Sequence, residues 1–169
     1  RSALVSRWKV SKKKIKILPI YLDVGKFEGL VTGHNLKLMF PEFKQIILML
    51  SRLTVEKNIS LAIELMQDIL PRYPSVGLVI VGSGPEKEKL EELIKEKGLE
   101  KNVRMLPWVD NPVSLYKSAD IFLHTANYEG YGLVLVEAAL SGTPIVTTDV
   151  GVVGDIINEF NALIAPVGD

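Results

Sequence analysis

The chain has 169 residues, 47% of them hydrophobic, which is enough apolar material for one packed globular domain. Its 20 basic and 20 acidic residues balance, so the composition argues against a general nucleic-acid-binding surface. The absence of cysteine excludes disulfides, thiolate metal sites and cysteine catalysis, and no apolar run approaches the ~20 residues that span a membrane.

Residues 1–40 show the least regular pattern, and we predict a segment that leads into the domain without extensive secondary structure. The first 18 residues contain no acid and these basic residues: Arg1, Arg7, Lys9, Lys12, Lys13, Lys14 and Lys16. A solvated linker or surface strand explains such a run, and contact with an anionic surface such as a membrane is the alternative. Because the first residue is not methionine, we expect a fragment of a longer protein.

After this segment, short apolar runs alternate with longer amphipathic runs. The apolar runs predict buried strands at residues 46–50, 77–81, 103–106, 120–125 and 144–147. The amphipathic runs predict helices at residues 56–70, 85–97, 112–119 and 131–141. This alternation predicts the α/β class, as a Rossmann-like three-layer α/β/α open parallel sheet. Ligands bind such sheets beyond the carboxyl ends of the strands, so the loops after residues 50, 81, 106 and 125 are the candidates for a site.

The loop after the first strand carries two cations five residues apart, Arg52 and Lys57, at a turn into a helix. An anion bound there would meet helix-start amides, the positive end of the helix dipole and both cations. Taken alone, this loop is better explained as a solvated turn.

The second and third loops give weaker signals. Residues 82–85, Gly-Ser-Gly-Pro, resemble a dinucleotide fingerprint, but Lys87 stands where its third glycine belongs. We therefore favour a tight strand-to-helix turn that needs Gly82 for its backbone and borders a ligand site. After the third strand, Trp108 and Val109 could flank a planar base, and a tryptophan packed on the domain surface is the alternative.

The fourth loop and the helix after it hold two glutamates eight positions apart, Glu129 and Glu137. Glu137 lies in an otherwise apolar helix, so it requires a hydroxyl, an amide or a cation, and a structural salt bridge to Arg or Lys is the alternative to a ligand. Eight helical residues span roughly 12 Å, enough for two carboxylates to reach separate hydroxyls of one ligand. Gly130 and Gly132 would let that ligand approach the helix-start amides. Ribose, diphosphate and sugar fit this layout in order.

In this order, the motifs resemble the carboxyl-terminal domain of the retaining glycosyltransferase family 4, whose enzymes have the two-domain GT-B architecture. The resemblance covers residues 15–169 and rests on the Arg52 and Lys57 pair, the turn at residues 82–85, the two glutamates and residues 142–151. The chain departs from the family's usual glycines at Ser51, Asn58 and Val152.

The resemblance implies a role for each motif. Arg52 and Lys57 would bind the donor diphosphate and stabilise the leaving nucleotide. Glu137 would hold the ribose hydroxyls, and Glu129 would contact the donor sugar near the reacting centre. The predicted catalytic residues are Glu129, Arg52 and Lys57. The predicted substrate-binding residues are Arg52, Lys57, Gly82, Trp108, Val109, Glu129, Gly130, Tyr131, Gly132, Leu133 and Glu137.

The resemblance also implies an activity. Residues 1–169 would form a single nucleotide-sugar-binding domain, and the amino-terminal, acceptor-binding domain of the same protein would be absent from the chain. The whole enzyme would transfer a hexose, with retention, from a UDP- or GDP-linked donor to a glycan, lipid or small molecule. It would need no metal or other cofactor, because cations and helix-start amides stabilise the leaving group. We expect a cytoplasmic protein, with the membrane surface as the alternative location, that binds no nucleic acid and is inactive as this fragment.

Two alternatives stay open at this point. One is a GT-B relative with another activity, such as a nucleotide-sugar epimerase or a phosphorylase. The other is a non-catalytic nucleotide-binding module.

Overall fold

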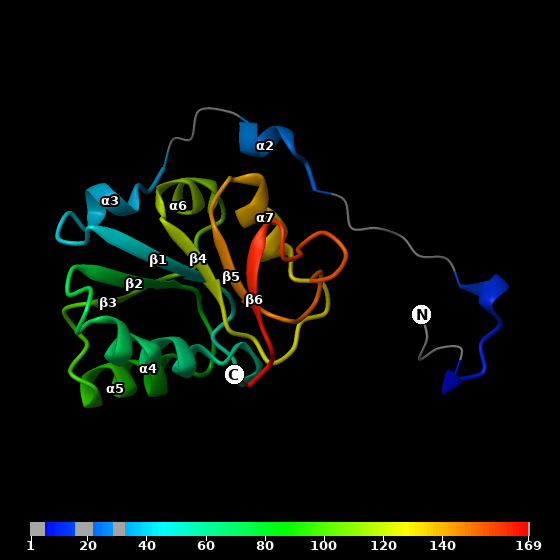
Figure 1. The fold of residues 1–169 in the computed structure, drawn as a ribbon, viewed down its shortest axis with the longest axis horizontal. Coiled ribbons are helices and arrows are strands. Elements are labelled where there is room, and N and C mark those ends of the chain that lie inside the picture. Colours follow the sequence, from blue (N-terminus) through cyan, green and yellow to red (C-terminus); the bar gives the residue numbers. More distant parts are fainter. Residues whose placement is uncertain (1–5, 16–21, 29–32, 169) are drawn as a thin grey trace.

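The computed structural model describes residues 6–15, 22–28 and 33–168 (Figure 1). The strands are β1 (Gln45–Leu50), β2 (Val76–Val81), β3 (Val103–Leu106), β4 (Ile121–His124), β5 (Ile145–Thr148) and β6 (Ala162–Ala165). The helices are α2 (Gly25–Glu28), α3 (Leu36–Met39), α4 (Ile59–Ile69), α5 (Lys87–Glu96), α6 (Val113–Ser118) and α7 (Leu133–Leu140), with 3₁₀ turns η1 (Lys12–Lys14) and η2 (Val55–Lys57). In this part of the chain no helix is long and apolar enough to cross a membrane.

The six strands form one parallel sheet in the order β3-β2-β1-β4-β5-β6. The strand order reverses between β1 and β4, so the loops that follow these two strands diverge at one point on the edge of the sheet. Such a reversal is where ligands bind in open α/β sheets. The Rossmann-like α/β class predicted from the alternating runs is confirmed, and residues 162–165 add a sixth strand.

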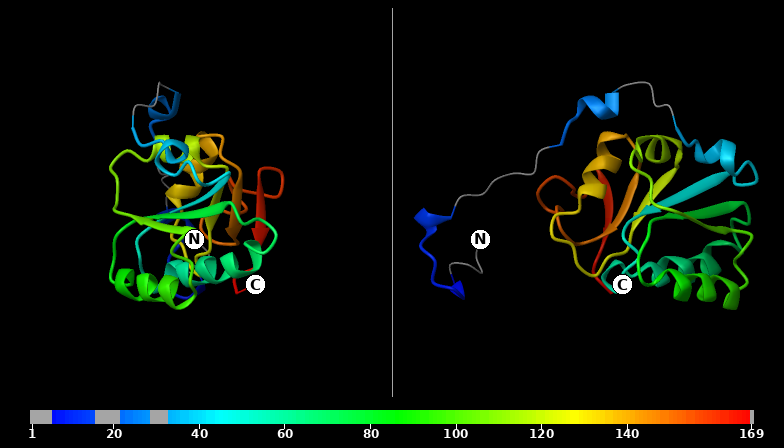
Figure 2. Two further views of the ribbon diagram at one scale, coloured as in Figure 1. Left: turned by 90° about the vertical axis from the view of Figure 1, so that its left-hand side faces the viewer. Right: turned by 180° about the vertical axis from the view of Figure 1, so that it is seen from behind.

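Helices cover both faces of the sheet. In Figure 1, α4 and α5 lie on one side, and α6 and α7 lie on the other, and the view from behind in Figure 2 shows the same separation. Successive residues of a strand point to opposite faces, so Ile47 and Met49 pack towards α4 and α5, whereas Leu48 and Leu50 pack towards α6 and α7. Both faces of β1 and β2 are buried, which is why the sequences of these strands show no polar alternation.

Two helices begin later than the sequence predicted, because local turns intervene. In the helix predicted at 85–97, residues 84–86 form a turn in which the Glu86 amide donates to the Leu53 carbonyl (3.0 Å), so α5 begins at Lys87. In the helix predicted at 131–141, Gly132 has φ +85°, and α7 begins only at Leu133.

The predicted helix at 56–70 is likewise divided. Asn58 adopts the left-handed conformation (φ 47°, ψ 44°) between η2 and α4. Glycine is usual in this conformation, and asparagine tolerates it better than other side chains, which explains how the chain departs from the family pattern there without losing the turn.

The leading segment carries short elements where it is described. Its helices α2 and α3 have four residues each, in agreement with the weak pattern of residues 1–40. Arg1 and Lys16 of the basic run lie outside the described residues. Arg7 stacks over the ring of Trp8 at 5.9 Å, and contact of this run with an anionic surface stays a prediction.

Candidate functional site

The turn after β1 and the loop after β4 are joined by hydrogen bonds at the point where the strand order reverses. The Thr125 hydroxyl lies within hydrogen-bond distance of the carbonyls of Lys57 (3.1 Å) and Asn58 (2.9 Å). The Asn127 amide donates to the Glu56 carbonyl at 2.8 Å. These contacts bring together the two motifs that the sequence places about seventy residues apart.

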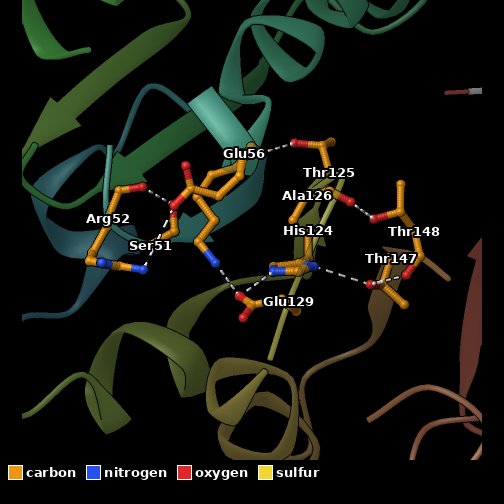
Figure 3. Close-up of polar contacts among 10 residues, drawn as sticks. Ser51, Arg52, Glu56, His124, Thr125, Ala126, Glu129, Thr147 and Thr148 are labelled. Carbon is orange, nitrogen blue, oxygen red and sulfur yellow. Dashed lines mark hydrogen bonds and ion pairs between the residues drawn. The ribbon is translucent and has the colours of Figure 1, made fainter. Parts of the chain in front are cut away.

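At this junction, Lys57 forms an ion pair with Oε1 of Glu129. Nε2 of His124 lies 3.3 Å from the same oxygen (Figure 3). The Lys57 side chain is 8% exposed and that of Glu129 is 15% exposed. The hydrogen bond from His124, together with the hydrogen bond and charge of Lys57, lowers the pKa of Glu129 to about 2 against the opposing effect of burial. Glu129 is therefore a carboxylate at neutral pH.

Arg52 behaves differently from Lys57. Its side chain is 73% exposed, and its guanidinium lies 3.7 Å from Glu56, four residues later. Such an exposed pair is weak, so the guanidinium can turn towards a ligand at little cost. The predicted pair of cations is thus one buried lysine and one exposed arginine on the rim.

Both cations line a hollow of about 320 Å³ at the start of α7. The other lining residues are Ser51, Trp108, Glu129, Gly130, Tyr131, Gly132, Leu133 and Val134. Most of the predicted substrate-binding residues therefore surround one space. Trp108 is 47% exposed at its border, which suits stacking against a ligand as well as the surface packing that was the alternative.

Glu137 borders a second and larger hollow of about 730 Å³. The Tyr116 hydroxyl donates to Oε2 of Glu137 at 3.0 Å, so the donor that this carboxylate required is a hydroxyl. Among the described residues Glu137 forms no ion pair. The alternative of a structural salt bridge to Arg or Lys is therefore not supported. Burial raises the pKa of Glu137, and the Tyr116 hydrogen bond opposes that rise.

The second hollow is lined by segments that are distant in sequence: Leu22, Asp23, Phe27, Asp110, Asn111, Pro112, Val113 and Glu137. The Lys117 ammonium donates to the Phe27 carbonyl at 2.7 Å and so attaches the leading segment beside this hollow. The two glutamates consequently face two different spaces, one on the side of Lys57 and one on the side of the leading segment.

Gly82 and Val109 are placed differently from the other predicted residues. The Gly82 amide donates to the Leu106 carbonyl (3.0 Å), and a Cβ on Gly82 would lie only 2.0 Å from the Ser51 carbonyl oxygen. This agrees with a tight turn that needs glycine for close approach of two strands. Val109 is partly buried against the core. Neither residue borders the two hollows, and their roles as substrate contacts stay predictions.

Sequence reasoning missed two residues that shape the site. His124 was predicted only as part of a buried strand, although a polar side chain at the carboxyl end of such a strand was an available signal. Gly151, with φ +63°, entered the sequence analysis only as the end of the resembling stretch 142–151, yet a Cβ on it would lie 2.4 Å from the Tyr131 carbonyl oxygen. The loop after β5 can therefore press directly against residues 129–131.

No group of three or more His, Cys, Asp or Glu side chains that could hold a metal ion occurs in the described parts of the chain. Whether catalysis proceeds without a metal stays a prediction.

Comparison with known proteins places the chain in one family. Residues 36–169 match the family model described as glycosyl transferases group 1. The chain is 39% identical over 123 residues to an uncharacterized glycosyltransferase of Methanocaldococcus jannaschii, covering 71% of the chain and 31% of the relative. It is 35% identical over 159 residues to the gpi3 subunit of a phosphatidylinositol N-acetylglucosaminyltransferase of Schizosaccharomyces pombe, covering 93% and 34%. The chain spans between a fifth and two fifths of the length of the curated relatives that it matches.

Solved structures are similar in fold. A TarM mutant of S. aureus, in complex with fondaparinux, alpha-GlcNAc-glycerol and UDP, superimposes with a TM-score of 0.69 at 29% identity, over 74% of this chain and 26% of that one. The carboxyl-terminal domain of a group 1 family protein from Francisella tularensis has a TM-score of 0.73 at 22% identity, over 88% of this chain and 82% of that domain, and this shows the fold alone.

Proposed function

The chain belongs to the group 1 glycosyl transferases and fits the carboxyl-terminal domain of a GT-B enzyme, and on that premise we propose that it binds the nucleotide diphosphate sugar from which the enzyme transfers a sugar. The observation that carries this proposal is the hollow that gathers Arg52, Lys57 and Glu129 at the start of α7. A diphosphate there would meet two cations and the free amides of a helix start, and an adjoining sugar would meet a carboxylate.

We assign the two ends of the donor to the two hollows. The diphosphate lies against Arg52, Lys57 and the start of α7, with the sugar hydroxyls on Glu129. The ribose lies on Glu137, whose Oε1 has no hydrogen-bond partner among the described residues and can accept from a hydroxyl. The base lies towards Trp108 and Val109. UDP is the first nucleotide to test, because the TarM mutant structure contains it.

The reaction that we propose is hexose transfer with retention and without a divalent metal. Arg52, Lys57 and the α7 amides stabilise the charge that develops on the leaving diphosphate, which is the work a metal ion does elsewhere. The acceptor, a glycan, lipid or small molecule, would bind to an amino-terminal domain of the same protein in the cytoplasm, at the membrane surface if the basic run binds anionic lipid.

Calorimetry tests donor binding directly. The 169-residue chain is titrated with UDP, UDP-glucose, UDP-N-acetylglucosamine and GDP-mannose. We expect measurable heat with at least one nucleotide, and Arg52→Ala to weaken it about tenfold, equivalent to about 1.4 kcal/mol. Arg72→Ala is the matched control, because Arg72 is an exposed arginine distant from both hollows. The absence of heat with all four compounds, or unchanged affinity in Arg52→Ala, contradicts the proposal.

A further inference from the structure

His124 contacts Glu129 and has no role in the proposed chemistry. It ends β4, its side chain is buried, and both ring nitrogens have partners. Nε2 lies 3.3 Å from Oε1 of Glu129, and Nδ1 lies 3.3 Å from Oγ1 of Thr147 on the neighbouring strand β5 (Figure 3). The imidazole therefore bridges β5 and the loop that carries Glu129.

The direction of the hydrogen bond between His124 and Glu129 follows from the chemistry of the two groups. An ionised carboxylate can only accept, so Nε2 must carry the hydrogen that lies between His124 and Glu129. On the other side, the Thr147 hydroxyl lies 2.9 Å from the Thr148 carbonyl, which cannot donate. The single hydroxyl hydrogen of Thr147 goes either to that carbonyl, in which case Nδ1–H donates to Oγ1, or to Nδ1, in which case Nδ1 accepts. In both arrangements the contact with Thr147 on β5 fixes the plane of the ring.

Glu129 is held at one oxygen only. Lys57 and His124 both contact Oε1, whereas Oε2 has no hydrogen-bond partner among the described residues. A bound nucleotide-sugar donor would affect these two contacts differently. A bound diphosphate competes for the ammonium of Lys57, which lines the same hollow, but it cannot displace the buried imidazole.

We propose that His124 is a positioning residue for the donor sugar. Its hydrogen bond to Oε1 of Glu129 keeps Oε2 directed to a sugar hydroxyl when the diphosphate engages Lys57. This rests on the proposed function, since it assumes a donor in this hollow. A histidine that merely fills the core would influence all ligands alike, or none, and this difference makes the two roles separable.

Two substitutions of His124 distinguish these roles. In His124→Gln, the side-chain amide nitrogen occupies the place of Nε2 and still donates to Glu129. In His124→Asn, the amide reaches only the place of Nδ1, next to Thr147, and the contact with Glu129 is lost. Both variants are polar and smaller than histidine, so each is the control for the packing defect of the other.

The readout is the ratio of two dissociation constants measured by calorimetry, that of UDP-glucose to that of UDP. We expect His124→Asn to raise this ratio about tenfold, the loss of one hydrogen bond to a charged group, and His124→Gln to leave it within about twofold of the wild type. UDP itself should bind all three proteins equally well. If the variants change both constants by the same factor, or if His124→Gln fails like His124→Asn, positioning by His124 is refuted while donor binding stands.

NMR of the histidine ring nitrogens tests the contact between His124 and Glu129 without any nucleotide. The chain has two histidines, and His34 is exposed, so the protected signal belongs to His124. We expect a hydrogen on Nε2 that exchanges slowly in the wild type and rapidly in Glu129→Ala. A ring with Nε2 unprotonated overturns the inference. If the wild-type chain binds none of the nucleotides, the proposed function fails, and the role of His124 towards a donor sugar fails with it.

Discussion

At one end of the site, Glu129 faces Lys57 and His124, whereas at the other end Glu137 faces the hydroxyl of Tyr116. The pKa of Glu129 falls to about 2, and the pKa of Glu137 rises. Two glutamates from one motif thus differ because the hydrogen bond from His124, with the hydrogen bond and charge of Lys57, outweighs burial at Glu129, whereas burial outweighs the single hydroxyl donor at Glu137. The ionic end suits a ligand that brings phosphate charge, and the neutral end suits ribose hydroxyls.

Lys57→Met removes the cation beside Glu129, so that this carboxylate, like Glu137, has no ion pair. Of the substitutions, it should lower the stability of the fold most. It leaves a largely buried carboxylate without its cation, and we expect folding free energy to fall by about 3 kcal/mol in urea unfolding. Lys57→Met with Glu129→Gln should recover much of this loss, because no charge is then left unpaired. Lys101→Met, at an exposed lysine, is the control and should change stability by less than about 0.5 kcal/mol. Equal loss in the single and double variants would count against the ion pair as the cause.

Tyr116→Phe removes the donor from the Glu137 end. The carboxylate then lacks its partner, and we expect a loss of about 1–2 kcal/mol in the same unfolding assay. The Tyr116 hydroxyl is affected in turn, because burial first, and then the charge of Glu137, raise the pKa of Tyr116 well above its ordinary value. Tyr73→Phe, at an exposed tyrosine, is the matched control. A stability unchanged from the wild type would mean that solvent supplies the donor instead.

The pH dependence of stability should separate the two ends by sign. The pKa of Glu129 lies below its ordinary value of 4.5, so its stabilisation is present above pH 4.5 and is lost as the pH falls towards 2. The pKa of Glu137 is raised, so its relative stabilisation is present below pH 4.5 and is lost as the pH rises through the raised value.

Glutamine substitutions isolate these contributions in urea unfolding at a series of pH values. Glu129→Gln should flatten the acid side of the stability profile, and Glu137→Gln should flatten the decline above pH 4.5. The pH range of each effect identifies the residue responsible. Two variants with parallel profiles would show that the ends do not differ as described.

Arg52→Ala should have the smallest effect on the fold. Its side chain is 73% exposed and its pair with Glu56 is long, so we expect stability to change by less than about 0.5 kcal/mol. Its effect on diphosphate affinity should nevertheless be clear, which would sharpen the contrast between Lys57, a cation that also stabilises the fold, and Arg52, a cation that acts on the ligand alone. A loss of stability similar to that of Lys57→Met would remove this distinction.

Much of the fold and the general place of the site could be predicted from sequence. Apolar runs such as residues 77–81 can only be buried, and their alternation with amphipathic runs implies a covered parallel sheet. The positions of Arg52, Lys57 and Glu129 after predicted strands indicated one edge of the sheet, and the structure brings Lys57 and Glu129 into contact there. Helix starts could not be predicted as well, because the turn at residues 84–86 depends on Leu53, which is remote in sequence.

The sequence by itself determined the order of strands and helices, the edge of the sheet that carries the candidate site, and the need of Glu137 for a donor, because these follow from periodicity and from the cost of burying charge. Only the tertiary structure decided that Lys57 and not Arg52 is buried, that His124 contacts Glu129, and that the pKa values of the two glutamates shift in opposite directions. Those outcomes depend on distances of a few ångströms between groups on different strands and loops, and such distances exist only once β1, β4 and β5 lie side by side.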